Sequence, residues 1–109
     1  MARDSLGEFE HLVMLAILRL GGEAYSVTLV RELEERTQRD VSQAAVFIVL
    51  SRLEKKGLLE SRMAEHEAGA NGRVRRYFAP TPAGLQRIRQ SRRALVRLWE
   101  GLDATLDEA

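Results

Sequence analysis

The hydrophobic positions in the first part of the chain recur with a helical period. Ser5 and Glu8 have the spacing of a capping box, so we expect a first helix to begin at Ser5. Its apolar residues recur at intervals of three or four: Phe9, Val13, Ala16 and Leu20. The pair Gly21-Gly22 supplies a left-handed stop, and this helix is predicted to be largely buried.

Two further helices follow, joined by a short connection. Ser26 or Thr28 is expected to cap a helix that ends near residues 37–39. Ser42 caps the next one, and Gly57 ends it after a stripe of four apolar positions: Val46, Val49, Leu50 and Leu53. The pair is typical of a helix-turn-helix.

From Leu58 onward the hydrophobic period changes to two, which indicates strands. A glycine-containing loop over residues 67–72 joins a first strand to a second that spans 73–78, so the sequence predicts a hairpin. Pro80 is expected to end the second strand early, because proline has no N–H to donate to a neighbouring strand. Thr81 followed by Pro82 is a strong helix start.

The last helix is predicted to run from Pro82 to about Leu106. Its apolar residues alternate at spacings of three and four and form a heptad seam with one polar member, Arg92; the apolar members are Leu85, Ile88, Leu95, Trp99, Leu102 and Leu106. A helix of this length spans about 36 Å, more than the core of a 109-residue chain can cover. We therefore expect Leu95, Trp99, Leu102 and Leu106 to meet a second copy of the chain.

Charge is distributed unevenly, although the net charge is only +1. Residues 1–67 carry −3, residues 68–99 carry +8 with no carboxylate, and residues 100–109 carry −4. Arg73, Arg75 and Arg76 lie beside the glycine-containing loop, where arginine forks suit phosphate oxygens. The arginines at 87, 89, 93 and 97 are either a solvated helix face or part of the same polyanion-binding surface.

This order of elements predicts a mainly α (α+β) winged helix-turn-helix with a two-stranded β wing and a long C-terminal dimerisation helix. The third helix would enter the major groove of double-stranded DNA while the basic hairpin contacts the adjacent backbone or minor groove. Residues 1–80 would form the DNA-binding part and residues 81–109 the dimerisation helix of one compact domain.

Other classes of function find little support in the sequence. The chain has no cysteine, no apolar run longer than Leu12–Leu18 and no leader pattern, so we expect a cytoplasmic protein without a membrane segment. The two histidines, His11 and His66, have no neighbouring ligand motif, and we expect neither a metal nor a cofactor. No nucleophile elbow or phosphate-binding glycine loop is present, so an enzyme is not expected.

Three segments of the chain resemble the PadR family of bacterial transcriptional regulators, in the short form with a single C-terminal helix. They are GEAYSVTLVRELEE (22–35), SQAAVFIVLSRLEKKGLLESR (42–62) and GRVRRYFAPTPAGL (72–85). The resemblance implies a homodimer that binds a pseudo-palindromic operator, usually as a repressor, and that a small molecule sometimes releases. Because some relatives hold planar ligands between aromatic residues of paired helices, Trp99 is also a candidate contact for a small aromatic or hydrophobic effector.

The resemblance also assigns the DNA-binding residues. The operator-facing side of the recognition helix would be Ser42, Gln43, Ala44, Phe47 and Ser51, with Ile48 beside them by helical geometry, and the wing would be Arg73, Arg75 and Arg76. Gln43 is the clearest base-reading candidate, since a glutamine amide pairs with adenine. The chain departs from the family pattern at Ser26, where glycine is usual, and at Phe47, where tyrosine is usual.

Phe47 and Ile48 make the outward face of the recognition helix unusually apolar, and three interpretations stay open. The side chains could contact thymine methyl groups, pack on the wing or on the second helix, or form a surface that binds another protein. The third interpretation defines the alternative function, a winged-helix interaction module with weakened or no DNA binding.

Overall fold

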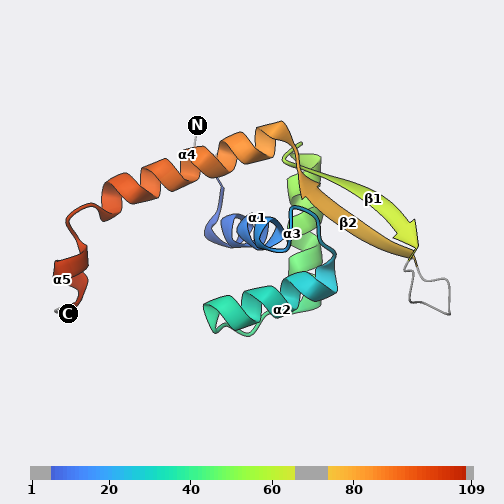
Figure 1. The fold of residues 1–109 in the computed structure, drawn as a ribbon, viewed down its shortest axis with the longest axis horizontal. Helices are drawn as coiled ribbons and strands as arrows, with labels where there is room; N and C mark the ends of the chain where they lie inside the picture. Colours follow the sequence, from blue (N-terminus) through green and yellow to red (C-terminus); the bar gives the residue numbers. More distant parts are fainter. Residues whose placement is uncertain (1–5, 66–73, 108–109) are drawn as a thin grey trace.

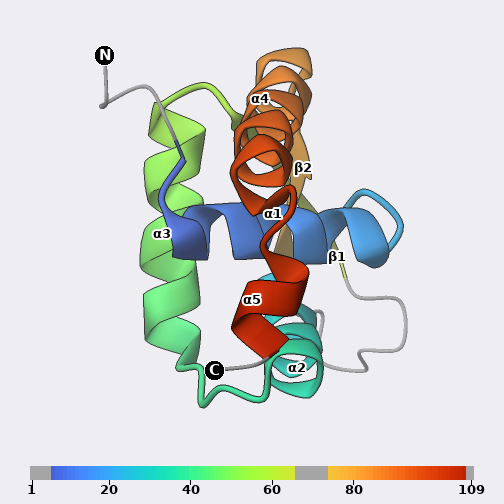
Figure 2. The same ribbon diagram turned by 90° about the vertical axis from the view of Figure 1, so that its left-hand side faces the viewer.

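The computed structural model describes residues 6–65 and 74–107, and it follows the predicted order of elements with one additional short helix at the end. The first three helices are α1 (Glu8–Arg19), α2 (Ser26–Thr37) and α3 (Gln43–Lys55). Helix α1 packs against α3 and against the later helix α4 (Pro82–Trp99), and it crosses α3 in the view of Figure 2 (Figures 1 and 2).

The first two helices begin at caps other than the predicted ones. The cap of α1 is Gly7, whose N–H donates to the Glu10 carboxylate at 2.9 Å, so the predicted start at Ser5 is wrong; Ser5 itself lies outside the described residues. The cap of α2 is Tyr25, without a capping side chain, and the Thr28 hydroxyl donates to the Tyr25 carbonyl at 3.0 Å. Prediction succeeded at α3, where the Ser42 hydroxyl accepts from the N–H of Ala45 at 3.0 Å.

One hydrophobic core joins the three helices, the hairpin and the start of α4. Its largest fully buried side chains come from every one of these elements except α4: Val13, Met14, Ile17, Leu29, Val46, Leu50, Leu53, Leu59 and Phe78. The apolar stripe predicted for α3 is entirely buried, as the helical period requires. In α1 the burial is less complete than predicted, because Val13 and Ala16 are buried but Phe9 and Leu20 are only half-buried.

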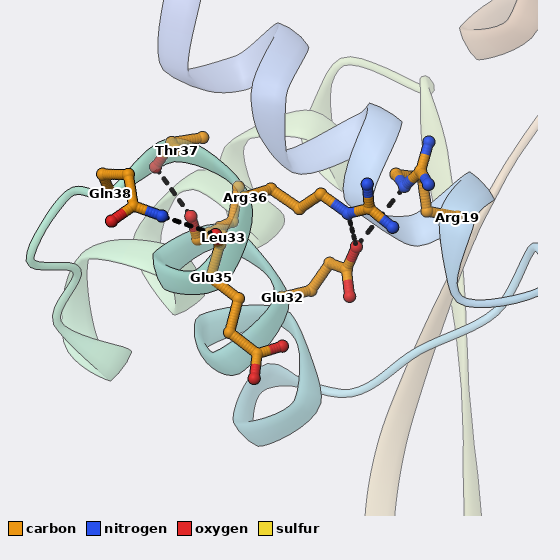
Figure 3. A network of polar contacts seen from close by, with 7 residues as sticks. All are labelled: Arg19, Glu32, Leu33, Glu35, Arg36, Thr37 and Gln38. Carbon is orange, nitrogen blue, oxygen red and sulfur yellow. Dashed lines mark hydrogen bonds and ion pairs between the residues drawn. The ribbon is translucent and has the colours of Figure 1, made fainter.

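Polar contacts fix the exposed side and the end of α2 (Figure 3). The Glu32 carboxylate pairs with Arg36 at 3.0 Å and with Arg19 of α1 at 3.5 Å, so it ties the two helices together. Beyond Thr37 the chain leaves the helix through Gln38, which has a left-handed φ of 60°. The Gln38 amide donates to the Glu35 carbonyl at 3.0 Å, which satisfies one of the free acceptors at the helix end.

The hairpin consists of β1 (Leu59–Glu65) and β2 (Val74–Pro80), paired antiparallel from Leu59 opposite Pro80 to Glu65 opposite Val74. Pro80 therefore does not end the second strand early, contrary to prediction. Phe78 exchanges two backbone hydrogen bonds with Ala24 on the side away from β1, at 2.8 and 3.1 Å. Because backbone groups two residues apart point to the same side, the nitrogen of Pro80 also points away from β1 and removes no bond of the ladder.

Helix α4 starts as predicted and is anchored to the end of α3. The Thr81 hydroxyl accepts from the N–H of Gly84 at 3.1 Å and donates to the Gly57 carbonyl at 2.7 Å. The N–H of Thr81 donates to the Leu58 carbonyl at 3.1 Å. Gly84 passes so close to this carbonyl that a side-chain carbon there would lie 2.1 Å from the Leu58 oxygen.

The C-terminal helix is shorter than the sequence predicted. It ends at Trp99, and Gly101 has a φ of 79°, which only glycine adopts readily. A separate five-residue helix, α5 (Asp103–Asp107), follows. The heptad spacing continues across this break, but the residues on both sides of it are exposed, so no packing within the chain favours a continuous helix.

These elements form a winged helix: a three-helix unit, a two-stranded wing and a helix that extends beyond the unit. In Figure 1, α4 leaves the top of α3 in the direction opposite to the wing. The molecule measures 54 × 30 × 22 Å along its principal axes because of these two extensions. In the part of the chain that the structure describes, no helix has the length and apolar character needed to cross a membrane.

Candidate nucleic-acid interface

The outward face of α3 presents the residues predicted for the recognition helix. Its buried side is fixed by the apolar stripe, so the remaining positions turn outward: Gln43, Ala44, Phe47 and Ile48 are exposed and Ser51 is half-buried. Ser42 is exposed too, but its hydroxyl is already engaged at the helix cap. The structure thus brings the predicted set to one face.

Phe47 and Ile48 stand out from this face. Their exposed fractions are 46% and 58%, so neither side chain is buried in the protein. Two of the three interpretations, contact with thymine methyl groups and contact with another protein, require exposed apolar groups of this kind.

Gln43 is held by the neighbouring helix. Its side-chain Nε2 donates to the Ser26 hydroxyl oxygen at 3.2 Å, across seventeen positions of sequence. Gln43 opens α3 and Ser26 opens α2, so the contact joins the starts of two helices.

The arginines of the wing differ in their surroundings. Arg73 lies outside the described residues. The Arg75 guanidinium carbon lies 4.3 Å from the centre of the Tyr25 ring, a cation–π contact that holds it beside the start of α2. Arg76, the next residue, is exposed.

The contact of Arg75 belongs to a stack that fastens the wing to the segment before α2. The rings of Tyr25 and Tyr77 meet edge to face with centres 5.5 Å apart, and Arg62 of β1 lies over the Tyr77 ring at 5.1 Å. Arg62 also donates two hydrogen bonds to the Glu23 carboxylate, at 2.6 and 2.7 Å, which lower the pKa of Glu23 and raise that of Arg62. We call residues 23–26 the junction segment.

Sequence reasoning missed this segment. Its contacts join residues that are far apart along the chain, and they depend on the register of the hairpin against residue 24. The only local signal is the clustering of tyrosine and arginine at two separate places, which does not identify partners.

The arginine-rich region carries few internal ion pairs. The ion pairs found among residues 6–65 and 74–107 involve Arg19, Arg36, Arg39, Lys56 and Arg62, and none involves Arg75, Arg76 or an arginine of α4. Positive charge in the described part of β2 and α4 is therefore available to an external anion.

An apolar groove lies between α1 and α4. It has a volume of about 850 Å³, and its apolar lining consists of four leucines, Ala94 and Trp99. Its polar lining consists of Glu8, His11, Arg87, Gln90 and Ser91. Leu95 and Trp99 are about half exposed in this groove. Leu102 and Leu106 are exposed to a similar extent, but they lie beyond the end of α4, whereas the sequence predicted them on the same helix.

His11 has a structural partner, the hydroxyl group of Ser91. Its Nδ1 lies 2.9 Å from the Ser91 hydroxyl, and burial lowers its pKa below the ordinary value of 6.5. Within the described ranges no group of three His, Asp or Glu side chains is placed to hold a metal ion. His66 falls outside those ranges.

An exposed helix face beside a basic wing is the arrangement of the winged-helix regulators of transcription. Residues 14–90 match the family described as "Transcriptional regulator PadR-like family", and the chain belongs to this family. The comparison with curated proteins gives no match.

Solved structures of PadR-family regulators have the same fold. A regulator from Eggerthella lenta is 26% identical, with 94% of this chain and 88% of that chain aligned and a TM-score of 0.69. A PadR-like regulator from Bacillus cereus is 21% identical over 92% and 88% of the two chains, with a TM-score of 0.69. A PadR-family regulator from Clostridium difficile is 18% identical over 90% and 98%, with a TM-score of 0.72.

Proposed function

We propose that this chain is a DNA-binding repressor that occupies a pseudo-palindromic operator as a homodimer in the cytoplasm. The observation that carries the proposal is the junction segment. Its neighbouring residues Tyr25 and Ser26 contact the wing arginine Arg75 and the recognition-helix residue Gln43, so a phosphate-binding group and a base-reading group lie side by side.

The wing arginines and the residues of the recognition helix have different roles in DNA binding. Arg75 and Arg76, together with Arg73, which precedes them in the sequence, bind backbone phosphates and supply affinity that does not depend on sequence. Ser42, Gln43, Ala44, Phe47, Ile48 and Ser51 face the major groove. Gln43 reads an adenine edge, while Phe47 and Ile48 contact thymine methyl groups.

Residues 81–109 provide the dimer contact in this proposal. Leu95 and Trp99 on the projecting helix α4, and Leu102 and Leu106 beyond its end, are exposed apolar groups that a second copy would bury. Two recognition helices would then reach half-sites about 34 Å apart. A velocity sedimentation run at micromolar concentration that finds only monomer refutes this arrangement.

The groove between α1 and α4 suits a small aromatic or hydrophobic effector. Trp99 and the leucines around it offer an apolar lining beside the same residues that would hold the partner. An effector bound there would change the dimer geometry and release the operator. Titration of the Trp99 fluorescence, the signal of the only tryptophan, with planar aromatic compounds tests this part.

The central experiment measures duplex binding by fluorescence anisotropy at several salt concentrations, using DNA from around the chain's own gene. Arg76→Ala should weaken binding to every sequence and reduce the salt slope by about 0.9 for a lost phosphate contact. Arg93→Ala removes the same charge from an exposed position of α4 and shows whether the arginines of that helix belong to the same polyanion-binding surface or to a solvated face. Equal salt slopes for the wild type and Arg76→Ala contradict the role of the wing.

A second function is favoured by the exposure of Phe47 and Ile48. In it the same helix face binds a protein rather than DNA. Under this alternative the wild-type chain binds no duplex even at 50 mM salt, whereas the repressor hypothesis predicts its tightest binding there.

A further inference from the structure

Gln43 carries most of the hydrogen-bonding capacity of the recognition face. Ala44, Phe47 and Ile48 have no polar side-chain atoms, Ser51 is half-buried, and the Ser42 hydroxyl accepts from the N–H of Ala45. Base-specific hydrogen bonding by this face therefore depends on how the Gln43 amide is oriented.

Ser26 fixes that orientation. Nε2 of Gln43 donates one hydrogen to the Ser26 hydroxyl oxygen, which lies 3.2 Å away. The second hydrogen on Nε2 and the carbonyl oxygen Oε1 stay available, and these two groups are the donor and acceptor that pair with N7 and N6 of adenine. Pairing with adenine needs the hydrogen on the same side as Oε1, so the contact is compatible with base reading when Ser26 accepts the other hydrogen.

The serine itself is well fixed. It is the first residue of α2, and its neighbours Ala24 and Tyr25 are held by the bridge to Phe78 and by the stack with Tyr77 and Arg75. A long, exposed glutamine side chain is otherwise free to rotate, and ordering it costs binding free energy.

We infer that Ser26 is a specificity-determining positioning residue, which holds the Gln43 amide in the orientation that reads adenine. This inference rests on the proposed DNA-binding function and adds to it a residue that lies outside the recognition helix. Ser26 need not touch DNA to act in this way.

The test is selection of bound sequences from a random duplex library, performed with the full chain and five variants. The wild type should enrich A·T at one position of each half-site, and Gln43→Ala should lose that preference. Ser26→Ala should reduce the preference for A·T at the same position by about three- to tenfold, which corresponds to the loss of one hydrogen bond. Its affinity for unselected DNA should stay unchanged. Ser26→Thr keeps the hydroxyl and should restore the preference.

Thr28→Val is the matched control. It removes a hydroxyl from the same first turn of α2, but that hydroxyl donates to the Tyr25 carbonyl and does not reach Gln43. It should leave the selected sequence unchanged. A double variant, Ser26→Ala with Gln43→Ala, should select like Gln43→Ala alone, because the serine acts only through the glutamine.

A measurement without DNA checks the contact directly. The heteronuclear NOE of the Gln43 side-chain amide should fall in Ser26→Ala and not in Thr28→Val, since only the first variant frees the amide. Unchanged amide dynamics in Ser26→Ala refute the positioning contact.

The outcomes separate this inference from the proposed function. A wild-type chain that enriches no sequence refutes the proposed function and base reading with it. A wild-type chain that enriches a sequence which Ser26→Ala selects with the same preference refutes the role of Ser26 alone.

Discussion

Gly84 is the position where the structure makes its sharpest prediction about stability. The first turn of α4 packs there against the connection between α3 and β1. In Gly84→Ala the new methyl carbon would lie 2.1 Å from the Leu58 carbonyl oxygen and 3.0 Å from the Met14 methyl group. Carbon–oxygen contacts normally begin at about 3.3 Å, so the helix must move by roughly 1 Å.

The cost follows from what has to move. The Met14 side chain can change rotamer, but the Leu58 carbonyl is backbone and accepts from the N–H of Thr81 at 3.1 Å. Overpacking of this kind costs about 1–3 kcal/mol, and weakening the hydrogen bond adds about 1 kcal/mol. Alanine recovers up to about 1 kcal/mol through its helix propensity. The net loss should be about 2 kcal/mol, or a fall in Tm of roughly 10 °C for a domain of this size.

Urea and thermal unfolding followed by circular dichroism measure this loss. All samples should have one protein concentration, because assembly stabilises the folded state by mass action. Gly7→Ala is the control: a side-chain carbon at Gly7 meets only the Glu10 carboxylate, at 3.6 Å, so its cost should stay below about 1 kcal/mol, the value of a changed cap. A Gly84→Ala protein within 0.5 kcal/mol of the wild type, about half the smallest overpacking cost, refutes the close approach.

Three further predictions concern charge and helix ends. Burial alone would raise the pKa of Glu10, but the hydrogen bonds from Gly7 and Lys56 lower it below 4.5; Lys56→Met should therefore cost about 1 kcal/mol at pH 7 in urea unfolding. That cost should vanish in acid as Glu10 is protonated, and an equal cost at pH 7 and pH 3 would contradict this explanation. His11 has a lowered pKa, so the unfolded chain binds more protons below pH 6.5 and the unfolding free energy should fall from pH 7.5 to 5.5; His11→Gln should show a smaller fall, and an identical pH profile would count against the burial argument. Gly101→Ala disfavours the left-handed φ of 79° at this position and should therefore extend α4. The longer helix should give a stronger circular-dichroism signal at 222 nm, and an unchanged signal would show that the break does not depend on glycine.

The sequence predicts a structural feature well where a few neighbouring residues determine it. The Ser42 cap and the Thr81-Pro82 start need only local chemistry, and the structure confirms both. The predicted start of α1 at Ser5 was wrong because a second pair, Gly7 and Glu10, has the same three-residue spacing as Ser5 and Glu8. The choice between them involves Lys56, which donates to the Glu10 carboxylate at 3.0 Å from forty-six residues away.

The same distinction applies to the candidate site. Helical periodicity was enough to place Gln43 and Phe47 on the outward face of α3. It could not place Ser26 beside Gln43 or Tyr25 beside Arg75, because those contacts depend on how α2 and the hairpin pack. Periodicity also led to a predicted last helix that is too long, because a heptad pattern does not reveal the turn at Gly101 that follows the observed end at Trp99.

The close packing of Gly84 on the Leu58 carbonyl helps to set the angle at which α4 leaves the domain. From Gly84 to Trp99 the helix extends about 22 Å at 1.5 Å per residue. A change of about 10° in the direction of α4 at Gly84 therefore displaces Trp99 by about 4 Å. This displacement is larger than the distance of about 3.4 Å between neighbouring base pairs. In the proposed dimer the partner is held at the far end, so the tight packing of a single glycine would set which operator spacing the two recognition helices can match.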